Sequence, residues 1–362
     1  MAEDQDWRRI GEQVRQARLS MALSQQELAD EVGLERTMLA KVEAGIRRLD
    51  GLELMKLSRA LKVSMEYLIE ARPLVLSRRT GMLSEETDTQ AARSTERLEA
   101  TLVEWLHNVR QLMVLGVLRP SPLLRHRGPI GSEEEARGAA DWLRHTLNIE
   151  DGPVGSMSDV CARAGQWVLV TDLPGDGASL VDGDLAVAVV STEGLPGRRR
   201  ATAAHELGHL ILGDEYSTDL GVNASRADRE SVIDAFAAEL LLPVRVMAEN
   251  KGSLTRDQLI SYAARYRTSW VLALRQAERA GAIDAATRRA WTQNRPTRAE
   301  FMDALGWAPQ PDLTYARVPP TYAQAVMDAW RSDRITRARA VELMHGQITE
   351  ADLPDDDLDI EP

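Results

Sequence analysis

The sequence predicts a mainly α protein with a small β-sheet, an α+β chain built from several units. Helical periodicity dominates residues 7–70 and again residues 226–349. Only two short apolar runs, at 167–170 and 185–190, are typical of strands. The chain has 362 residues, of which 44% are hydrophobic, so it is long enough for two or three domains with ordinary cores.

Residues 1–72 contain five short helical patterns, at 7–19, 25–32, 35–44, 52–61 and 64–69. In the first, Ile10, Val14 and Leu19 are expected to face inward. Ser24 is a good N-cap, and Glu27 completes a capping box with it. The second and third patterns are separated by a short turn at Gly33, which describes a helix-turn-helix.

This segment resembles the Cro/Xre type of repressor domain, through LSQQELA at 23–29 and GLERTMLAKVEAG at 33–45. The resemblance implies that the helix from Glu35 enters the major groove of double-stranded operator DNA. Base contacts are expected from Arg36 and Thr37, and phosphate or base contacts from Gln25 and Lys41. Two arginines of the next loop are expected to contact phosphates: Arg47 and Arg48.

Each of these arginines could instead be an ordinary solvated charge. Residues 1–72 hold 12 basic and 13 acidic side chains, a net charge of −1, and the whole chain carries −12. DNA binding would therefore depend on one local face and on avidity from a homodimer.

Residues 73–130 are expected to form a helical linker. Thr95, Leu98, Leu102, Trp105, Val109 and Leu112 repeat at alternating steps of three and four residues, as in a heptad seam. Such a seam could pair two protomers. We favour a helix packed on its own domain, because sustained coiled coils need more heptads. A run rich in proline and glycine ends this segment at 120–131.

The segment 131–290 is organised around a helix at 200–213 whose centre reads HELGH at 205–209. His205 and His209 are four residues apart and share one helical face, so both imidazoles can bind one Zn²⁺. Glu206 can then act as the general base toward the attacking water. An amphipathic helix that matches the pattern by chance is the alternative. Ahead of it, helices are expected at 133–147 and 158–164, with turns between the two strands.

A catalytic zinc needs a third protein ligand, and the helix expected at 226–243 supplies candidates. We choose Glu230, about twenty residues beyond His209. Asp234 lies one turn further on the same face, where it can orient a ligand histidine. Either carboxylate could instead belong to a solvated helix face. Glu239 points away from this face and ranks low.

Two separated stretches here resemble the ImmA/IrrE family of metallopeptidases: RATAAHELGHL at 200–210 and ESVIDAFAAELLLP at 230–243. The resemblance implies a zincin-like fold and gives Glu230 the third-ligand role. This chain has Asp234 where the family more often has Asn. An edge strand of the small sheet could hold an extended peptide substrate. Tyr216 and Arg200 are weak candidates for the group that stabilises the oxyanion.

Two helices are expected at 254–283, then a helical extension at 291–349 and an acidic, disordered tail at 350–362. The single cysteine, Cys161, rules out an internal disulfide and fits a reducing cytosol. No apolar run is long enough for a membrane span, and the acidic N-terminus does not resemble a secretory signal. We therefore expect a cytoplasmic protein without a membrane partner.

Two functions fit this organisation. In the first, a DNA-binding transcriptional regulator carries a zinc endopeptidase that cleaves a partner repressor or regulatory protein, in a stress or mobile-element response. In the second, the chain is a DNA-binding antitoxin or repressor, and its zinc unit is a sensor or a surface that binds a toxin partner. The intact Glu206 favours chemistry, because a purely structural site needs ligands and no base.

Overall fold

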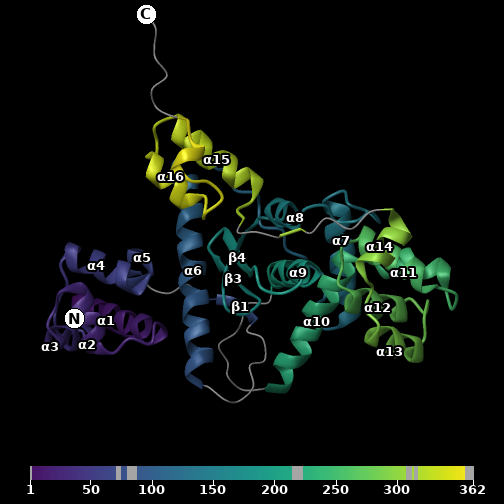
Figure 1. Ribbon diagram of the computed structural model, residues 1–362, viewed down its shortest axis with the longest axis horizontal. Helices are drawn as coiled ribbons and strands as arrows, with labels where there is room; N and C mark the ends of the chain where they lie inside the picture. Colours follow the sequence, from purple (N-terminus) through teal and green to yellow (C-terminus); the bar gives the residue numbers. More distant parts are fainter. Residues whose placement is uncertain are drawn as a thin grey trace, which may run out of the picture.

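The computed structural model describes residues 2–70, 75–79, 88–213, 223–306, 312–313 and 317–354. It shows a helical unit at the N-terminus, one long central helix, a four-stranded sheet, and two further groups of helices (Figure 1). Within the described ranges, no helix is both long enough and apolar enough to cross a lipid bilayer. The predicted class, mainly α with a small sheet, is confirmed.

The N-terminal unit consists of α1 (Ala2–Ser20), α2 (Gln25–Val32), α3 (Arg36–Glu43), α4 (Gly51–Leu61) and α5 (Met65–Ile69). The capping box of Ser24 and Glu27 starts α2 as expected, and Gly33 ends it with a positive φ of 72°. Ile10 and Val14 enter the core, but the expectation for Leu19 is wrong: this residue is 43% exposed, because nine residues at 100° each place it on the opposite side of the helix from Ile10.

The central helix α6 (Asp88–Val114) stands between the N-terminal unit and the sheet (Figure 1). Ala100 and Val103 join the core of α1–α5. The opposite face carries the apolar seam, which is buried against the sheet and the C-terminal helices: Leu98, Leu102, Trp105, Val109 and Leu112. The favoured interpretation, a helix packed on its own chain, is confirmed. These seam residues are covered inside the protomer, so the alternative, in which they pair two protomers, is wrong.

The sheet has the order β1-β3-β4-β2, with β1 (Val75–Arg79), β2 (Gln166–Thr171), β3 (Gly177–Asp182) and β4 (Leu185–Ser191). β4 pairs parallel with β2 and antiparallel with β3. Alternate residues of β4 reach two different cores: Val187 and Val189 pack toward α6, whereas Ala188 and Val190 pack toward the other face. A strand that is buried on both faces reads as one continuous apolar run.

Two strands were missed by the sequence analysis. β3 lies in the segment that was expected to form only turns, and β1 lies in the linker that was expected to be helical. Glycine, alanine and serine in β3 carry little strand signal of their own. Both strands are held by main-chain pairing to their neighbours, a tertiary effect that local propensity does not report.

The face of the sheet that is turned away from α6 is covered by four helices: α7 (Glu133–Thr146), α8 (Met157–Arg163), α9 (Pro196–Leu212) and α10 (Asn223–Leu241). They share one hydrophobic core with this face of the sheet. Every residue of α9 from Thr202 to Leu212 is buried, which makes α9 the central helix of this layer. Pro196 at the start of α9 and Gly213 after its end, with φ of 66°, follow the usual preferences for helix termini.

After the 3-10 helix Val244–Asn250, α11 (Arg256–Arg265), α12 (Trp270–Arg279), α13 (Ala285–Gln293) and α14 (Arg298–Leu305) pack around a separate core. The last helices, α15 (Pro320–Arg331) and α16 (Arg337–Leu343), return to cover α6 and the sheet. The expected domain limits at 131 and 290 stay predictions. Residues from both sides of each limit share one hydrophobic core, which is formed by α6, the sheet, α15 and α16.

The disordered tail was expected to begin at residue 350, and for its first five residues this is wrong. Glu350–Asp352 forms a short 3-10 helix, and Leu353 is buried. The guanidinium of Arg337 donates to the carbonyl oxygens of Glu350, Leu353 and Pro354, which fixes this turn against α16. The rest of the predicted tail, 355–362, lies outside the described residues.

Candidate metal centre and nucleic-acid surface

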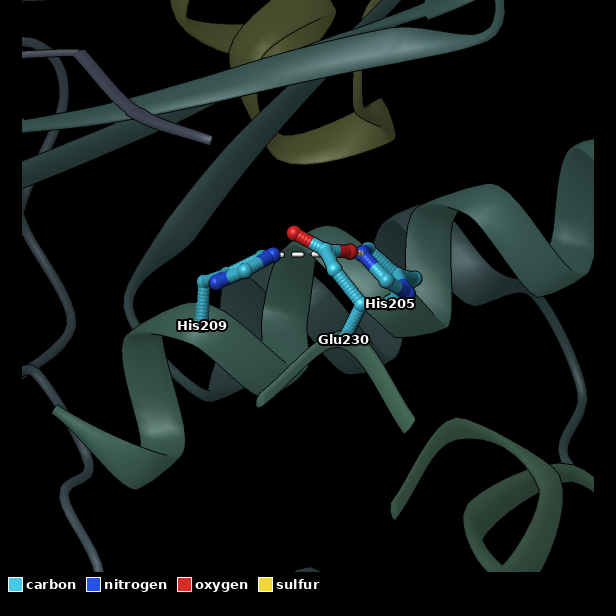
Figure 2. A group of neighbouring side chains, drawn as sticks. All are labelled: His205, His209 and Glu230. Atoms are coloured by element: carbon cyan, nitrogen blue, oxygen red, sulfur yellow. Dashed lines mark hydrogen bonds and ion pairs between the residues drawn. The ribbon is translucent and has the colours of Figure 1, made fainter. Parts of the chain in front are cut away.

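The first two residues of the candidate metal centre come from α9. His205 and His209 lie on one face of the helix, with their side chains turned toward each other (Figure 2). Their Nε2 atoms are 3.1 Å apart, and both residues are almost completely buried. Two nitrogen ligands on a tetrahedral Zn²⁺ are separated by about 3.3 Å when each bond is about 2.05 Å. The spacing within α9 is therefore that of a pair of ligands.

The third residue comes from α10, which runs beside α9. Oε2 of Glu230 lies 3.2 Å from Nε2 of His205. One donor atom from each of Glu230, His205 and His209 lies within 4.8 Å of the others (Figure 2). The structure thus brings the predicted metal-binding residues into one cluster, from two helices that are separated in sequence.

The two helices can approach this closely because Gly208 has no side chain. A Cβ atom at this position would lie 3.0 Å from Cγ2 of Ile233 and 3.0 Å from Cδ1 of Phe236, both on α10. That distance is shorter than ordinary van der Waals contact. Gly208 was not singled out by the sequence analysis, although it lies inside the HELGH motif.

Asp234 determines how the ring of His205 is used. Its Oδ1 lies 2.8 Å from Nδ1 of His205. Nδ1 therefore carries a hydrogen and donates a hydrogen bond to the carboxylate of Asp234. In the neutral ring, Nε2 then has a lone pair, and this lone pair faces Oε2 of Glu230 and Nε2 of His209. A metal cation can accept a lone pair from all three of these atoms at once, which a single proton cannot do. The donor set therefore fits a divalent metal ion, and its N₂O composition suits Zn²⁺.

Glu206 is completely buried next to His205, and its carboxylate is held by the sheet. Ser179 of β3 donates a hydrogen bond of 2.7 Å from Oγ to Oε2 of Glu206. Gln166 of β2 donates from Nε2 to the main-chain carbonyl of Glu206 over 3.0 Å. Sequence reasoning missed Ser179 and Gln166, because a serine in an unrecognised strand carries no signal of what it faces.

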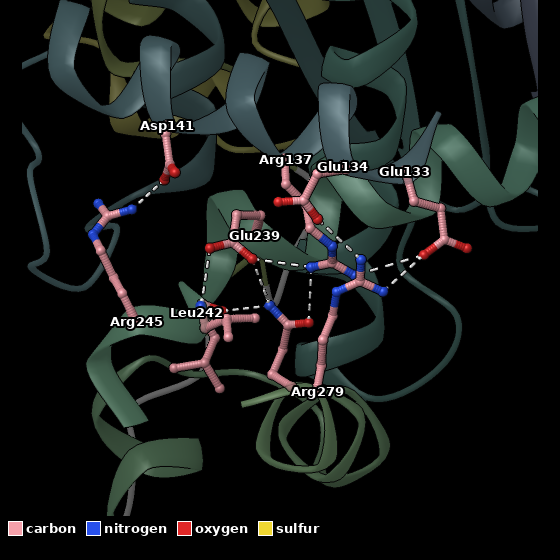
Figure 3. Close-up of polar contacts among 10 residues, drawn as sticks. Glu133, Glu134, Arg137, Asp141, Glu239, Leu242, Arg245 and Arg279 are labelled. Carbon is pink, nitrogen blue, oxygen red and sulfur yellow. Dashed lines mark hydrogen bonds and ion pairs between the residues drawn. The ribbon is translucent and has the colours of Figure 1, made fainter. Parts of the chain in front are cut away.

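Glu239, on the same helix as Glu230, has a structural role, as its low rank anticipated. It accepts hydrogen bonds from Arg137 of α7, Gln276 of α12 and the main-chain N–H of Val244 (Figure 3). Nearby ion pairs tie the same elements together: Arg245 with Asp141, and Arg279 with Glu133 and Glu134 (Figure 3). This network fixes α10 at the end that is farther from Glu230.

Two arginines in the first turns of α9, Arg198 and Arg200, have partners away from the metal centre. Arg200 is fully buried and is bound by the carboxylate of Asp312 and the carbonyl oxygens of Val154 and Gly155, so its candidacy as an oxyanion donor is wrong. Arg198 pairs with Asp176 near the surface. Tyr216, the other candidate, lies outside the described residues.

The surface predicted to meet DNA is formed by α2, α3 and the loop after α3. Arg36, Thr37 and Lys41 of α3 are exposed, and so is Arg48. α3 is seated by an ion pair inside the unit, in which Arg18 of α1 binds Glu43 at 2.6 Å. Helix α3 thus exposes the expected Arg36, Thr37 and Lys41, and Glu43 near its end is held by α1.

The remaining two predicted DNA contacts have partners within the protein. Gln25 donates from Nε2 to Oε2 of Glu43 over 2.8 Å. Arg47 makes a two-point ion pair with Glu53 of α4, at 2.9 and 2.6 Å, and this hydrogen-bonded pair raises the pKa of the guanidinium and lowers the pKa of the Glu53 carboxyl. All six DNA contacts stay predictions.

The chain therefore combines a helix-turn-helix unit with a domain that carries a His-His-Glu centre. Comparison with known families agrees with both parts. The family described as Helix-turn-helix matches residues 14–68, and the family described as IrrE N-terminal-like domain, a peptidase family, matches residues 161–277. The fusion predicted from the sequence is confirmed.

The comparison with curated proteins finds no match. Among solved structures, the crystal structure of Bacillus thuringiensis PlcR in complex with the peptide PapR7 and DNA aligns over 93% of this chain and 91% of that chain. The two are 10% identical, with a TM-score of 0.18. A likeness of that size carries no argument about fold or function.

Proposed function

We propose that the chain is a DNA-binding transcriptional regulator whose second unit is a zinc-dependent endopeptidase that cleaves a partner repressor or other regulatory protein. The observation that carries this proposal is the convergence of His205, His209 and Glu230 beside a buried glutamate, Glu206. A structural metal site has no use for that glutamate, whereas hydrolysis of a peptide bond requires a base in this position.

Each side chain of the centre has a defined task in this proposal. His205, His209 and Glu230 would hold Zn²⁺, which supplies polarisation of the scissile carbonyl and acidification of the attacking water. Oε2 of Glu206 is held by Ser179, and its carboxylate takes the proton of the attacking water and returns it to the leaving amine. Asp234 keeps Nδ1 of His205 protonated, so that Nε2 remains available as a ligand.

The DNA partner is proposed to be a double-stranded operator bound through α3. Arg36, Thr37 and Lys41 are exposed on the helix that the helix-turn-helix fold directs into the major groove. A homodimer would place two such helices on two half-sites. Because the apolar seam of α6 is buried within the protomer, the dimer would have to use a different surface.

The decisive experiment compares new protein N-termini in cells that carry the wild-type chain or the Glu206→Gln variant, with and without DNA damage. Glutamine keeps the size of the side chain and removes the base. A cleavage product present only with the wild type would establish the peptidase and name its substrate. Equal N-terminal profiles, with zinc content and DNA binding intact in both proteins, would reject proteolysis and favour an antitoxin or repressor with a non-catalytic metal unit.

A further inference from the structure

The outer strand of the sheet comes from the segment that joins the two units. β1 pairs antiparallel with β3, and the Cα partners include Ser77 with Ser179, Arg78 with Ala178 and Arg79 with Gly177. Among the described strands, whose order is β1-β3-β4-β2, only β1 lies on this side of β3. Without β1, the N–H and C=O groups along one side of β3 would form a free sheet edge.

This edge of β3 lies at the metal centre. Ser179, in the middle of β3, donates a hydrogen bond to the carboxylate of Glu206, so this strand directly contacts the proposed base. β3 packs on α9, and β1 packs on α9 as well. The backbone of Ser77 in β1 is opposite Ser179, which places β1 alongside the part of β3 that serves the metal helix.

A free edge strand binds an extended peptide by main-chain hydrogen bonds, and the side chains of the peptide add selectivity. For this reason we propose that the outer edge of β3 is the binding site for an extended peptide, and that β1 is a tethered, substrate-like segment that occupies it. This inference rests on the proposed peptidase function, for which it names the substrate-binding strand and a means of regulation. An incoming peptide must displace β1 before it can bind.

Tethering makes this competition strong. A short intramolecular segment competes at an effective concentration on the order of millimolar. If the isolated β1 segment bound the open edge with an intrinsic Kd of about 0.1 mM, a free peptide would bind about ten times more weakly to the closed edge than to the open one. The site would hydrolyse peptides slowly until β1 is released.

The DNA-binding unit is directly connected to this segment. β1 follows α5, the last helix of that unit, and precedes α6. α5 is attached to α6 by a hydrogen bond from Tyr67 to Glu96, and Glu70 pairs with His107 of α6 at 2.8 Å. β1 is therefore flanked in the chain by two helices that are held to each other.

The test uses the full chain in a Glu206→Gln background, in which a bound peptide is not consumed. A Ser77→Pro/Arg78→Pro variant removes one main-chain donor toward β3, because successive N–H groups of a strand point to opposite sides. The matched control is Gly81→Pro/Met82→Pro, which places two prolines in the same linker beyond β1. The probe is a fluorescent peptide with the sequence VLSRR, read by anisotropy, together with hydrogen exchange of residues 177–182.

We expect the Ser77/Arg78 variant to bind the peptide at least about tenfold more tightly than the parent and the control, with faster exchange in β3. In the background with Glu206 intact, the same variant should hydrolyse test peptides faster. Equal peptide affinity and equal exchange in all three proteins would overturn the inference.

A second variant tests the same idea without opening the sheet. Arg78→Cys/Ala178→Cys places two cysteines at partner positions, so that oxidation locks β1 onto β3. The oxidised protein should lose peptide binding and hydrolysis, and a reductant should restore both. Binding by the oxidised form that is as tight as by the reduced form would overturn the inference.

The two proposals fail in different ways. If no variant hydrolyses any peptide but the proline variant still captures VLSRR, then the assignment of β1 stands and the peptidase does not. If hydrolysis depends on Glu206 but the prolines and the disulfide leave it unchanged, then the peptidase stands and the assignment of β1 does not.

Discussion

Ser179 of β3 donates a hydrogen bond of 2.7 Å to Oε2 of Glu206 on α9, and both side chains are fully buried. The bond joins the sheet to the metal helix at the residue that is proposed to act as the base.

We expect Ser179→Ala to lower kcat by about tenfold or more with little change in KM, because a hydrogen bond to a charged group contributes about 1.5–3 kcal/mol. Ser179→Thr keeps the hydroxyl and suits a strand, so it should restore most of the rate. The measurement is steady-state hydrolysis of a cleaved peptide, with zinc content determined in parallel. Loss of zinc in the alanine variant, or no loss of rate, would contradict a positioning role.

Removal of the ligand carboxylate and removal of the orienting carboxylate should be distinguishable. Glu230→Ala removes a ligand, so we expect it to be isolated without stoichiometric zinc. Asp234→Ala should weaken zinc binding by about 10- to 100-fold, as is typical for a partner of a ligand histidine. Asp234→Asn keeps an acceptor for Nδ1 of His205 and should lose less. Competition against a zinc-binding dye measures all three, and full metal content in Glu230→Ala would reject the third-ligand assignment.

The contact between α9 and α10 predicts a strong effect of one methyl group. Gly208→Ala would place Cβ 3.0 Å from side-chain atoms of Ile233 and Phe236, so we expect a loss of about 1–3 kcal/mol in the free energy of unfolding. Zinc affinity should fall as well, because Glu230 moves with α10.

The control for this overpacking is Gly138→Ala on α7, where a Cβ would meet no atom within 4 Å. The same substitution in an open helical position should stabilise the protein by about 0.5–1 kcal/mol. Denaturant unfolding measures both variants. Similar changes in the two would show that helix propensity, rather than the approach of α10, governs Gly208.

DNA binding should depend on the exposed face of α3. We expect Arg36→Ala to weaken operator binding by about 1–3 kcal/mol and to relax selectivity at one base pair. Lys41→Ala should reduce the slope of affinity against salt by about one unit if the ammonium contacts a phosphate. Anisotropy titrations with the chain's own promoter region, at several salt concentrations, test both. Arg15→Ala on α1 is the control, because Arg15 is exposed but lies outside the predicted surface. An Arg36 variant that behaves like this control would reject the recognition-helix assignment.

Stability should fall below neutral pH because of His345. Burial beside α6, with a smaller contribution from Arg339, lowers the pKa of His345 to about 4, whereas the unfolded chain has an ordinary value near 6.5. A pKa that is lowered on folding favours the neutral ring. The contribution to stability is therefore complete above about pH 6.5 and is lost as the pH falls toward 4, by up to about 3 kcal/mol.

We expect His345→Asn to flatten this dependence, since asparagine does not titrate and tolerates the left-handed φ of 48° at this position. The measurement is the free energy of unfolding in denaturant at several pH values between 4 and 7. An unchanged slope in the variant would assign the acid sensitivity to other groups.

Much of the site was predictable because its residues are close in sequence. The spacing of His205 and His209 follows from helical geometry alone, and the HELGH pattern names the base between them. The assignment of Glu230 as the third ligand needed the second motif, at 230–243. Glu230 reaches the two histidines only because α10 packs on α9, which the spacing within α9 does not predict. The helices of the N-terminal unit were predictable through their local signals, such as the capping box at Ser24 and the turn at Gly33.

Local sequence patterns were therefore enough to predict the helices, the ligand spacing and the presence of two units. Three features became visible only in the folded chain: the apolar seam of α6 is covered within the chain, Ser179 holds Glu206, and β1 lies along β3 beside the metal helix. An apolar stripe must be buried, and the main-chain groups of a sheet edge must be hydrogen-bonded. Neither requirement specifies which segment of the chain will be the partner. That choice depends on where distant parts of the chain meet when the whole protein folds.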